Sequence, residues 1–177
     1  YYLFHLTITT THGLHYSIID MSLPGNGSIP APLGDVVVNQ KDSLIFGADT
    51  LAEKIKIVQK GNTEDYGVIA RSINNDLFYS FEVTSAGINP VPIVSTISAM
   101  SWPTTFGSPI FSWLAVNKQR NIIAEANGYG PDVKLFSIDN NTGILAFGEV
   151  IIPTGPIGDD IPYGIEFSPS GDALYVN

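Results

Sequence analysis

Short runs of apolar and β-branched residues make up most of this sequence, and turn-forming residues separate them. The breaks are supplied largely by 17 glycines and 12 prolines. Many short strands with regularly placed turn signals are typical of an all-β protein. The best helix candidate, residues 51–58, alternates Ile55 and Ile57 with Lys54 and Lys56, and a period of two favours a strand. We therefore predict an all-β fold with little or no helix.

Some of the predicted strands are apolar at both odd and even positions. Residues 14–19 and 77–81 are the clearest examples. In a simple two-layer sandwich one face of each sheet meets water, so its strands alternate between apolar and polar residues. Strands that are apolar on both faces fit sheets that pack against a neighbour on each side, as the blades of a β-propeller do.

Three segments of the chain resemble one another, which indicates internal repeats. Each is an apolar strand that contains a serine (Ser17, Ser80 or Ser137) and leads into a turn and a further β-rich run. The serines are roughly 60 residues apart, more than the ~40–50 residues of common propeller repeats, so the loops must carry insertions. The clearest insertion is residues 28–34, which contain two prolines.

The repeats divide the sequence into strand sets that match propeller blades of four antiparallel strands. Residues 47–98 and 99–152 each predict a complete blade. Residues 1–46 predict the last three strands of a preceding blade, and residues 153–177 predict the first two strands of a following one. The chain is thus predicted to be a single partial β-propeller domain, residues 1–177, with about three and a half blades.

An incomplete set of blades raises the question of what closes it. A propeller closes with about four to eight blades, and an open set would expose sheet edges. The sequence begins at Tyr1, without the pattern of a signal peptide, and ends on an apolar run. We therefore expect a piece of a longer polypeptide, whose remainder, or else a second copy of this chain, completes the ring.

Composition and charge exclude several classes of partner. The formal net charge is −9, with 8 basic and 17 acidic residues, which argues against nucleic acid and against anionic membrane surfaces. No apolar run approaches the ~18 residues that a membrane span needs. The absence of cysteine rules out disulfides, cysteine nucleophiles and thiolate metal sites.

One segment near the end carries a family resemblance. Residues 163–176 resemble the blade motif YGxEFSPDGxxLYV of WD40-like and lactonase-like propellers, in which two strands flank a Ser-Pro-Ser-Gly turn. In that turn Pro169 presets φ and Gly171 can take a positive φ. Residues 135–143 resemble the strand and turn LFDFDNxTG of the same propellers.

Further segments narrow the resemblance to one group of proteins. Residues 14–22, 33–37 and 78–87, taken in order with the motifs above, resemble the N-terminal half of large secreted propellers of Bacteroidetes that are associated with gliding motility and type IX secretion. Residues 113–123 depart from the usual Ser-Pro-x-Gly turn, and the family's C-terminal sorting domain is absent. The resemblance implies an extracellular or outer-membrane-surface location and a non-enzymatic binding or scaffold role in motility or adhesion.

Aromatic residues in turn-rich stretches are the candidate ligand contacts. They are Trp102, Trp113 and Tyr129, with Phe106 beside them. Exposed aromatic side chains stack on sugars or anchor protein interfaces, so we expect a protein or a glycan as the partner. The alternative is that these rings pack between blades.

Two loops are candidate calcium sites, although we assign no cofactor. Asp159 and Asp160 lie in a Gly/Pro-rich loop, and Asp139 begins an Asn-rich turn. Carboxylates in loops suit calcium, but the EF-hand spacing is absent and the same residues also form plain turns.

The histidines give a weaker metal signal. His5 and His15 fall on neighbouring predicted strands, and His12 lies in the turn between them. Because the nearest carboxylate along the sequence is Asp20, the simpler interpretation is three structural histidines, and we assign no metal site.

Catalytic motifs are missing from the sequence. It contains no G-x-S-x-G elbow, phosphate-binding loop or H-E-x-x-H pair. Four glutamates are candidates for the carboxylate pair that glycoside hydrolysis needs. Glu82, Glu149 and Glu166 lie on predicted strands, and Glu125 follows one. We assign no catalytic residue and keep a lactonase-like hydrolase as the alternative function.

Two short motifs concern modification. Ser43 and Thr50 each follow an aspartate and precede a leucine. This pattern resembles the O-glycosylation signal of exported Bacteroidetes proteins, so the resemblance implies a glycoprotein modified at these two residues.

Overall fold

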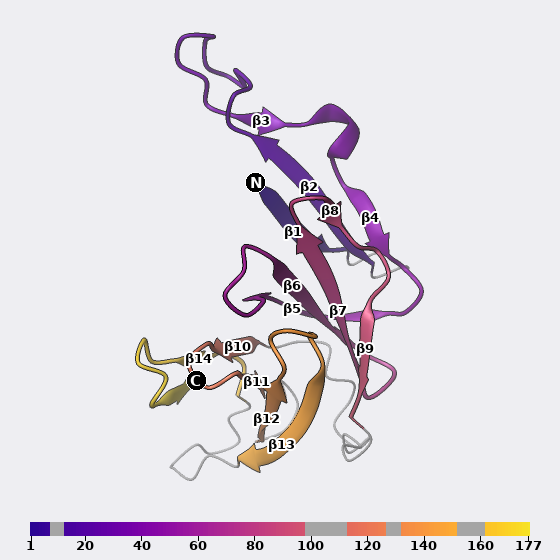
Figure 1. Ribbon diagram of the computed structural model, residues 1–177, viewed down its shortest axis with the longest axis vertical. Helices are drawn as coiled ribbons and strands as arrows, with labels where there is room; N and C mark the ends of the chain where they lie inside the picture. The colour runs from indigo at the N-terminus through magenta and orange to yellow at the C-terminus, as the bar shows by residue number, and fades with distance from the viewer. Residues whose placement is uncertain (8–12, 98–112, 127–131, 152–161) are drawn as a thin grey trace. The chain divides into compact units, whose positions relative to one another are not determined.

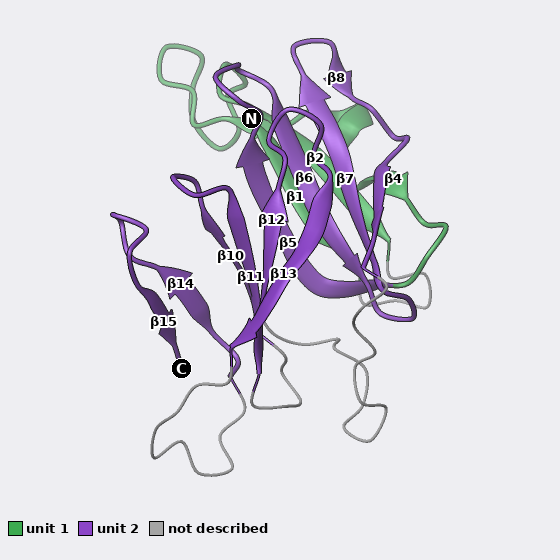
Figure 2. Ribbon diagram, turned by 60° about the horizontal axis from the view of Figure 1, so that its bottom comes forward, with its two compact units in different colours: residues 1–50 green, residues 51–177 purple. Residues whose placement is uncertain are grey.

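The computed structural model describes residues 1–7, 13–97, 113–126, 132–151 and 162–177. Within these residues the protein consists of antiparallel strands and one short 3₁₀ helix, which confirms the all-β prediction (Figure 1). No helix in the described part of the chain is long and apolar enough to cross a membrane. The chain divides into two compact units, residues 1–50 and 51–177 (Figure 2).

The first unit is a small sheet built around its second strand. Its elements are β1 (Tyr2–Leu6), β2 (Leu14–Asp20), β3 (Asp35–Val36), η1 (Val38–Gln40) and β4 (Ser43–Phe46). One edge of β2 pairs with β1 along its length. The other edge pairs with β4 near the start of β2 and with β3 near its end, so the excursion between β2 and β4 includes the predicted insertion at residues 28–34.

The second unit contains three antiparallel sheets in chain order. The first sheet comprises β5 (Leu51–Gln59), β6 (Tyr66–Ser72), β7 (Leu77–Thr84), β8 (Gly87–Ile88) and β9 (Ile93–Thr96). The second comprises β10 (Leu114–Asn117), β11 (Ile122–Ala126), β12 (Val133–Ile138) and β13 (Leu145–Ile151). The third is the hairpin of β14 (Ile165–Phe167) and β15 (Leu174–Val176). None of these sheets is closed among the described residues.

Strands β10, β11 and β12 pack on both faces, whereas β13 is largely exposed. On one face Phe136 meets Phe78 of β7, with ring centroids 5.0 Å apart, inside a large aliphatic and aromatic core. On the other face small residues pack against Ile165 of the hairpin; they are Ala115, Ala124, Ala126 and Val133. The two-sided packing explains why apolar residues in this region do not alternate with polar ones.

Neighbouring sheets of the second unit contact one another through their first strands and, for the two larger sheets, also through their last strands. Strand β10 contacts β5 on one side and β14 on the other, whereas β13 contacts β9. Each sheet of the second unit therefore follows its predecessor in both sequence and space.

Strand β5 confirms the strand predicted at residues 51–58, but its middle does not follow simple alternation. The pairing of β5 with β6 shifts register between Leu51 and Ile55. A bulge of this kind redirects the side chains that follow it. As a result Lys54 is buried, while Ile57 is exposed.

Candidate functional site

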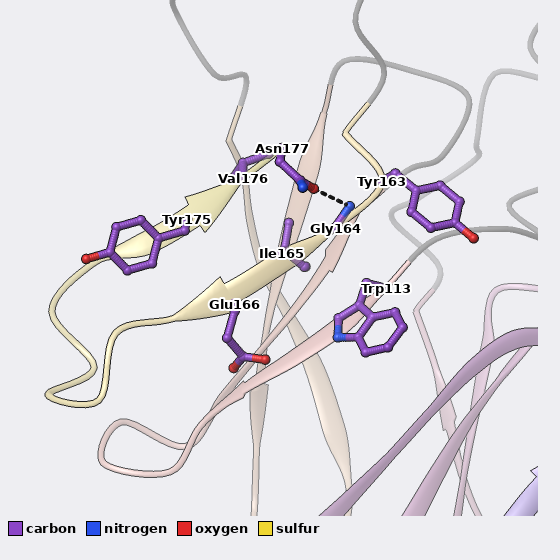
Figure 3. Close-up of a pocket in the computed structure, with 8 residues that line it drawn as sticks. All are labelled: Trp113, Tyr163, Gly164, Ile165, Glu166, Tyr175, Val176 and Asn177. Carbon is purple, nitrogen blue, oxygen red and sulfur yellow. Dashed lines mark hydrogen bonds between the residues drawn. The ribbon is translucent and has the colours of Figure 1, made fainter.

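A pocket of about 500 Å³ lies beside the hairpin β14–β15, and we name it the hairpin groove (Figure 3). Its lining residues are Trp113, Tyr163, Gly164, Ile165, Glu166, Tyr175, Val176 and Asn177. The register pairs Glu166 with Tyr175 and Ile165 with Val176. Since paired residues share a face of the sheet, Glu166 and Tyr175 lie on the opposite face from Ile165, which packs against the alanines.

Three aromatic side chains give the hairpin groove its character. Trp113, Tyr163 and Tyr175 are 51%, 56% and 64% exposed, although aromatic side chains bury large apolar areas when they pack. Trp113 and Tyr163 lie near one another, and Tyr175 projects at the far side of the hairpin (Figure 3). The groove thus presents apolar ring faces that a ligand can cover.

Polar groups border the same rings. The Glu166 carboxylate lies 3.7 Å from the Nζ atom of Lys56 on β5. That ammonium group also lies 5.9 Å from the centroid of the Trp113 ring, within cation–π range. The side-chain oxygen of Asn177 accepts a hydrogen bond from the backbone N–H of Gly164 at 3.0 Å. A side chain at position 164 would displace the side chain of Asn177 from this hydrogen bond.

The turn of the hairpin has the geometry that the sequence motif predicts. Gly171 has a φ of 73°, and its N–H donates to the Ser168 carbonyl at 2.8 Å. Asn117 of β10 donates from its side-chain amide to the Gly171 carbonyl at 2.7 Å. Arg120 pairs with Asp172 at 2.7 Å. These contacts fasten the turn end of the hairpin to the neighbouring sheet.

Of the aromatic candidates predicted from the sequence, the structure places Trp113 in the hairpin groove. Trp102, Phe106 and Tyr129 lie outside the described residues, as do Asp159, Asp160 and His12. Tyr163 and Tyr175 were not singled out as ligand contacts, although both belong to the blade motif. Their place in that motif was the available signal.

Asp139 has the environment of a turn former. Its carboxylate accepts hydrogen bonds from the backbone N–H groups of Asn141 at 2.9 Å and Thr142 at 3.4 Å. These hydrogen bonds, with Asn141 contributing most, hold the pKa of Asp139 below its ordinary value. The geometry supports the turn interpretation of this residue, and calcium binding there stays a prediction.

The four candidate glutamates lie on four different strands. Glu82 on β7 pairs with Lys60, and Glu166 on β14 pairs with Lys56. Glu149 lies on β13 and is exposed. The sequence analysis placed the fourth, Glu125, after a strand; this was wrong, because β11 continues through Ala126.

Glu125 is the centre of a buried ionic cluster that the sequence analysis missed. Its carboxylate accepts a hydrogen bond from Lys54 at 3.0 Å and lies 3.5 Å from the Nε atom of Arg71. Lys54 and Glu125 are fully buried. Burial lowers the pKa of Lys54, against the opposing effect of the Glu125 charge. We name these three residues the buried ion cluster.

Lys134 on β12 adjoins this region. Its ammonium group lies 3.9 Å from the Asp132 carboxylate. Burial lowers the pKa of Lys134 to about 8, although Asp132 and Glu125 act in the opposite direction. The sheets β5–β9 and β10–β13 therefore share a charged layer as well as an apolar core.

In the first unit, two of the histidines converge on one carboxylate. His5 and His15 lie on neighbouring strands, as the sequence predicted, and the pairing of β1 with β2 sets them directly opposite one another. The Nε2 atom of His5 and the Nδ1 atom of His15 each lie 2.9 Å from the same oxygen of Asp42. The expectation that Asp20 was the nearest acidic residue holds along the sequence but not in space.

The two predicted modification sites lie at the end of the first unit. Ser43 begins β4, and Thr50 is the last residue of the unit; both are half-buried. O-glycosylation of these residues stays a prediction.

Comparison with known proteins adds no relative. No protein-family model matches the sequence, and no curated protein resembles it at a significant level. The resemblance to secreted Bacteroidetes propellers therefore rests on the sequence motifs alone.

Proposed function

We propose that this chain is a non-enzymatic binding module, formed from β-propeller blades of a secreted bacterial surface protein, and that it binds a glycan in the hairpin groove. The observation that carries the proposal is the joint exposure of Trp113, Tyr163 and Tyr175 beside a carboxylate and an amide. Sugar rings present apolar C–H faces and a rim of hydroxyls. An aromatic surface with a few polar groups around it suits both.

The arrangement of the second unit supports propeller blades. Its sheets follow one another in sequence, and β10 contacts the first strand of the sheet before it and of the sheet after it. In a propeller the innermost strands of successive blades lie closest together around the axis. By this interpretation β5, β10 and β14 are the innermost strands, and the remainder of a longer chain or a second copy supplies the missing blades.

The glutamates favour binding over hydrolysis. A glycosidase needs two carboxyl groups that face each other across the scissile bond. Three of the candidate glutamates pair instead with lysines, namely Glu82 with Lys60, Glu125 with Lys54 and Glu166 with Lys56. By this interpretation Glu82 and Glu125 have a structural role, and Glu166 lines the hairpin groove.

A surface location is proposed from the composition and the motif resemblance. The chain is acidic and lacks cysteine. Surface biotinylation of intact cells of the source organism tests this part: labelling of the protein supports it, and labelling that requires lysis contradicts it.

Calorimetric titration with a panel of soluble oligosaccharides tests glycan binding. We expect one class of sugars in the panel to bind. Trp113→Ala should weaken the affinity for that class by at least about tenfold, which corresponds to ~1.4 kcal/mol. Tyr66→Ala is the matched control, since Tyr66 is an exposed aromatic residue of β6 outside the groove. Equal affinities of the two variants would contradict the proposal.

The same preparation separates the alternatives. Incubation with lactone and glycoside substrates would show turnover if the chain is a lactonase-like hydrolase. Turnover lost in Glu166→Gln, with the fold intact, would replace the binding function with a hydrolytic one.

A further inference from the structure

The cluster of His5, His15 and Asp42 has the composition of a metal site. One ligand atom from each residue can be chosen so that all lie within 4.8 Å of one another. His5 Nε2 and His15 Nδ1 each lie 2.9 Å from the same carboxylate oxygen of Asp42. We propose that these three side chains bind a single zinc-type divalent cation, and this proposal is independent of the hairpin groove.

The fold holds the two histidines in place. His5 and His15 are directly opposite one another on the paired strands β1 and β2, with ring centroids 5.6 Å apart. The second edge of β2 pairs with β4, and this pairing shifts register between Leu14 and His15. Bulges of this kind re-aim side chains. A side chain at Gly13 would meet the backbone oxygen of Phe46 at 2.9 Å and the Nε2 atom of His15 at 3.3 Å, so glycine leaves the room that His15 occupies.

The third ligand, Asp42, lies just before β4, and hydrogen bonds to β2 fix the position of its backbone. Asp42 has a φ of 53°, a left-handed conformation that aspartate and asparagine tolerate better than most residues. Its backbone N–H donates to the Ser17 hydroxyl at 3.0 Å. Its carbonyl oxygen also lies 3.2 Å from the Nδ1 atom of His15. The backbone of Asp42 is therefore tied to β2, which directs its carboxylate between the two rings.

The spacing suits zinc with little movement. Zinc bonds to nitrogen and carboxylate oxygen are about 2.0–2.2 Å long, which separates ligand atoms by roughly 3.4 Å. The two nitrogen–oxygen distances are 2.9 Å, so each would widen by about half an ångström when an ion lies between the three side chains. Three protein ligands with a fourth position open to water are the usual set of a non-structural zinc site.

The ligand types and exposure favour zinc over the alkaline-earth cations. Calcium and magnesium take oxygen ligands, whereas two imidazoles and one carboxylate suit zinc and its neighbours in the first transition row. The side chains of His5 and Asp42 are 37% and 62% exposed, and that of His15 is 15% exposed. The ion would thus reach the site from solvent and keep a position for water or for a ligand atom of a partner.

Zinc titration of the full chain tests the proposal. Calorimetry of the protein with zinc ions at neutral pH should give one site per chain. Asp42→Asn should weaken binding by at least about tenfold, because loss of even outer-sphere partners costs 10- to 100-fold. Asparagine accepts the left-handed backbone at this position, so the turn is retained.

Asp35→Asn is the matched control. Asp35 is another exposed aspartate of the first unit, and its carboxylate accepts from its own neighbour, Val36, at 2.7 Å. This variant should bind zinc as tightly as the unchanged protein. Equal weakening in both variants, or zinc binding that Asp42→Asn leaves unchanged, would overturn the proposal.

Cobalt substitution provides a second readout that does not depend on affinity. Cobalt in a site of two nitrogens and one carboxylate oxygen should give visible ligand-field bands, and His5→Gln and His15→Gln should each abolish or shift them. Absence of such bands in the unchanged protein, or bands that both variants retain, would mean that the three residues form a hydrogen-bonded ion pair without a metal function.

Discussion

Each unit contains a cluster of three converging polar side chains, and the two clusters differ in their exposure to solvent. The buried ion cluster of Lys54, Arg71 and Glu125 is sealed within the second unit. The cluster of His5, His15 and Asp42 is open to solvent in the first. The buried ion cluster joins strands of two sheets, whereas the open cluster joins the paired strands β1 and β2 to the residue just before β4.

Burial decides what each cluster can do. Taking charges out of water carries a large desolvation cost that the partner must offset, so a buried pair is poorly placed to exchange its partner for a ligand. An exposed group pays little for its charge and can change partners. We therefore interpret the buried ion cluster as structural and the open cluster as a place for a ligand.

The largest effect should follow from Glu125→Gln. This change removes the buried carboxylate that Lys54 and Arg71 share, while Arg71 keeps its contact with Asp76 at 3.5 Å. Breaking a buried pair costs about 3–5 kcal/mol. Chemical denaturation measures the free energy of unfolding. Glu149→Gln, on the exposed strand β13, is the control and should cost less than about 0.5 kcal/mol. Equal stabilities of the two variants would contradict the structural role.

A smaller effect should appear when pH is raised. The folded pKa of Lys134, about 8, lies below the ordinary value of 10.5, so between these values the unfolded chain binds more protons. The free energy of unfolding should therefore rise with pH in this window, by about 2 kcal/mol near pH 9.5 relative to Lys134→Met.

The comparison with an exposed lysine isolates this effect. Lys118→Met removes an exposed lysine and should follow the pH dependence of the unchanged protein. Urea denaturation of the unchanged protein and of each variant, at pH 7 and at pH 9.5, gives the four free energies of unfolding that each comparison needs. If Lys134→Met kept the same pH dependence of stability as the unchanged protein, groups other than Lys134 would be responsible for that dependence.

The smallest effect should follow from Asp42→Asn in metal-free solution. The contacts with His5 and His15 that it removes lie at the surface, where such contacts contribute little to stability. The melting temperature should therefore change little without zinc, while the rise on adding zinc to the unchanged protein should be lost. A large loss of stability without metal would indicate that the cluster is structural after all.

The sequence predicted the strands more successfully than the sites, for a physical reason. Strand periodicity and turn residues are local, so the strand at residues 51–58 and the turn at Gly171 could be recognised directly. The placement of His5 and His15 on neighbouring strands could also be predicted, although their direct opposition came from the register in the structure. Asp42 could not be foreseen as their partner, because a long excursion from β2 returns it to the sheet.

The buried ion cluster was missed for a related reason. The alternation around Lys54 gave no sign that a bulge turns this lysine inward. Its partner Glu125 is 71 residues away in sequence and belongs to another sheet. In the hairpin groove, Trp113 was one of the candidate ligand contacts, with packing between blades as the alternative. Its approach to Lys56, which pairs with Glu166, depends on how three sheets stack.

The alanine face of β10–β13 has a consequence for motion. On this face small residues pack against Ile165, and partly buried side chains surround them; these are Leu135, Phe167, Leu174 and Val176. Hydrogen bonds from Asn117 and Arg120 restrain the turn end. Local opening should therefore be asymmetric, with the turn acting as a hinge, and the width of the groove can adjust to the thickness of what enters it.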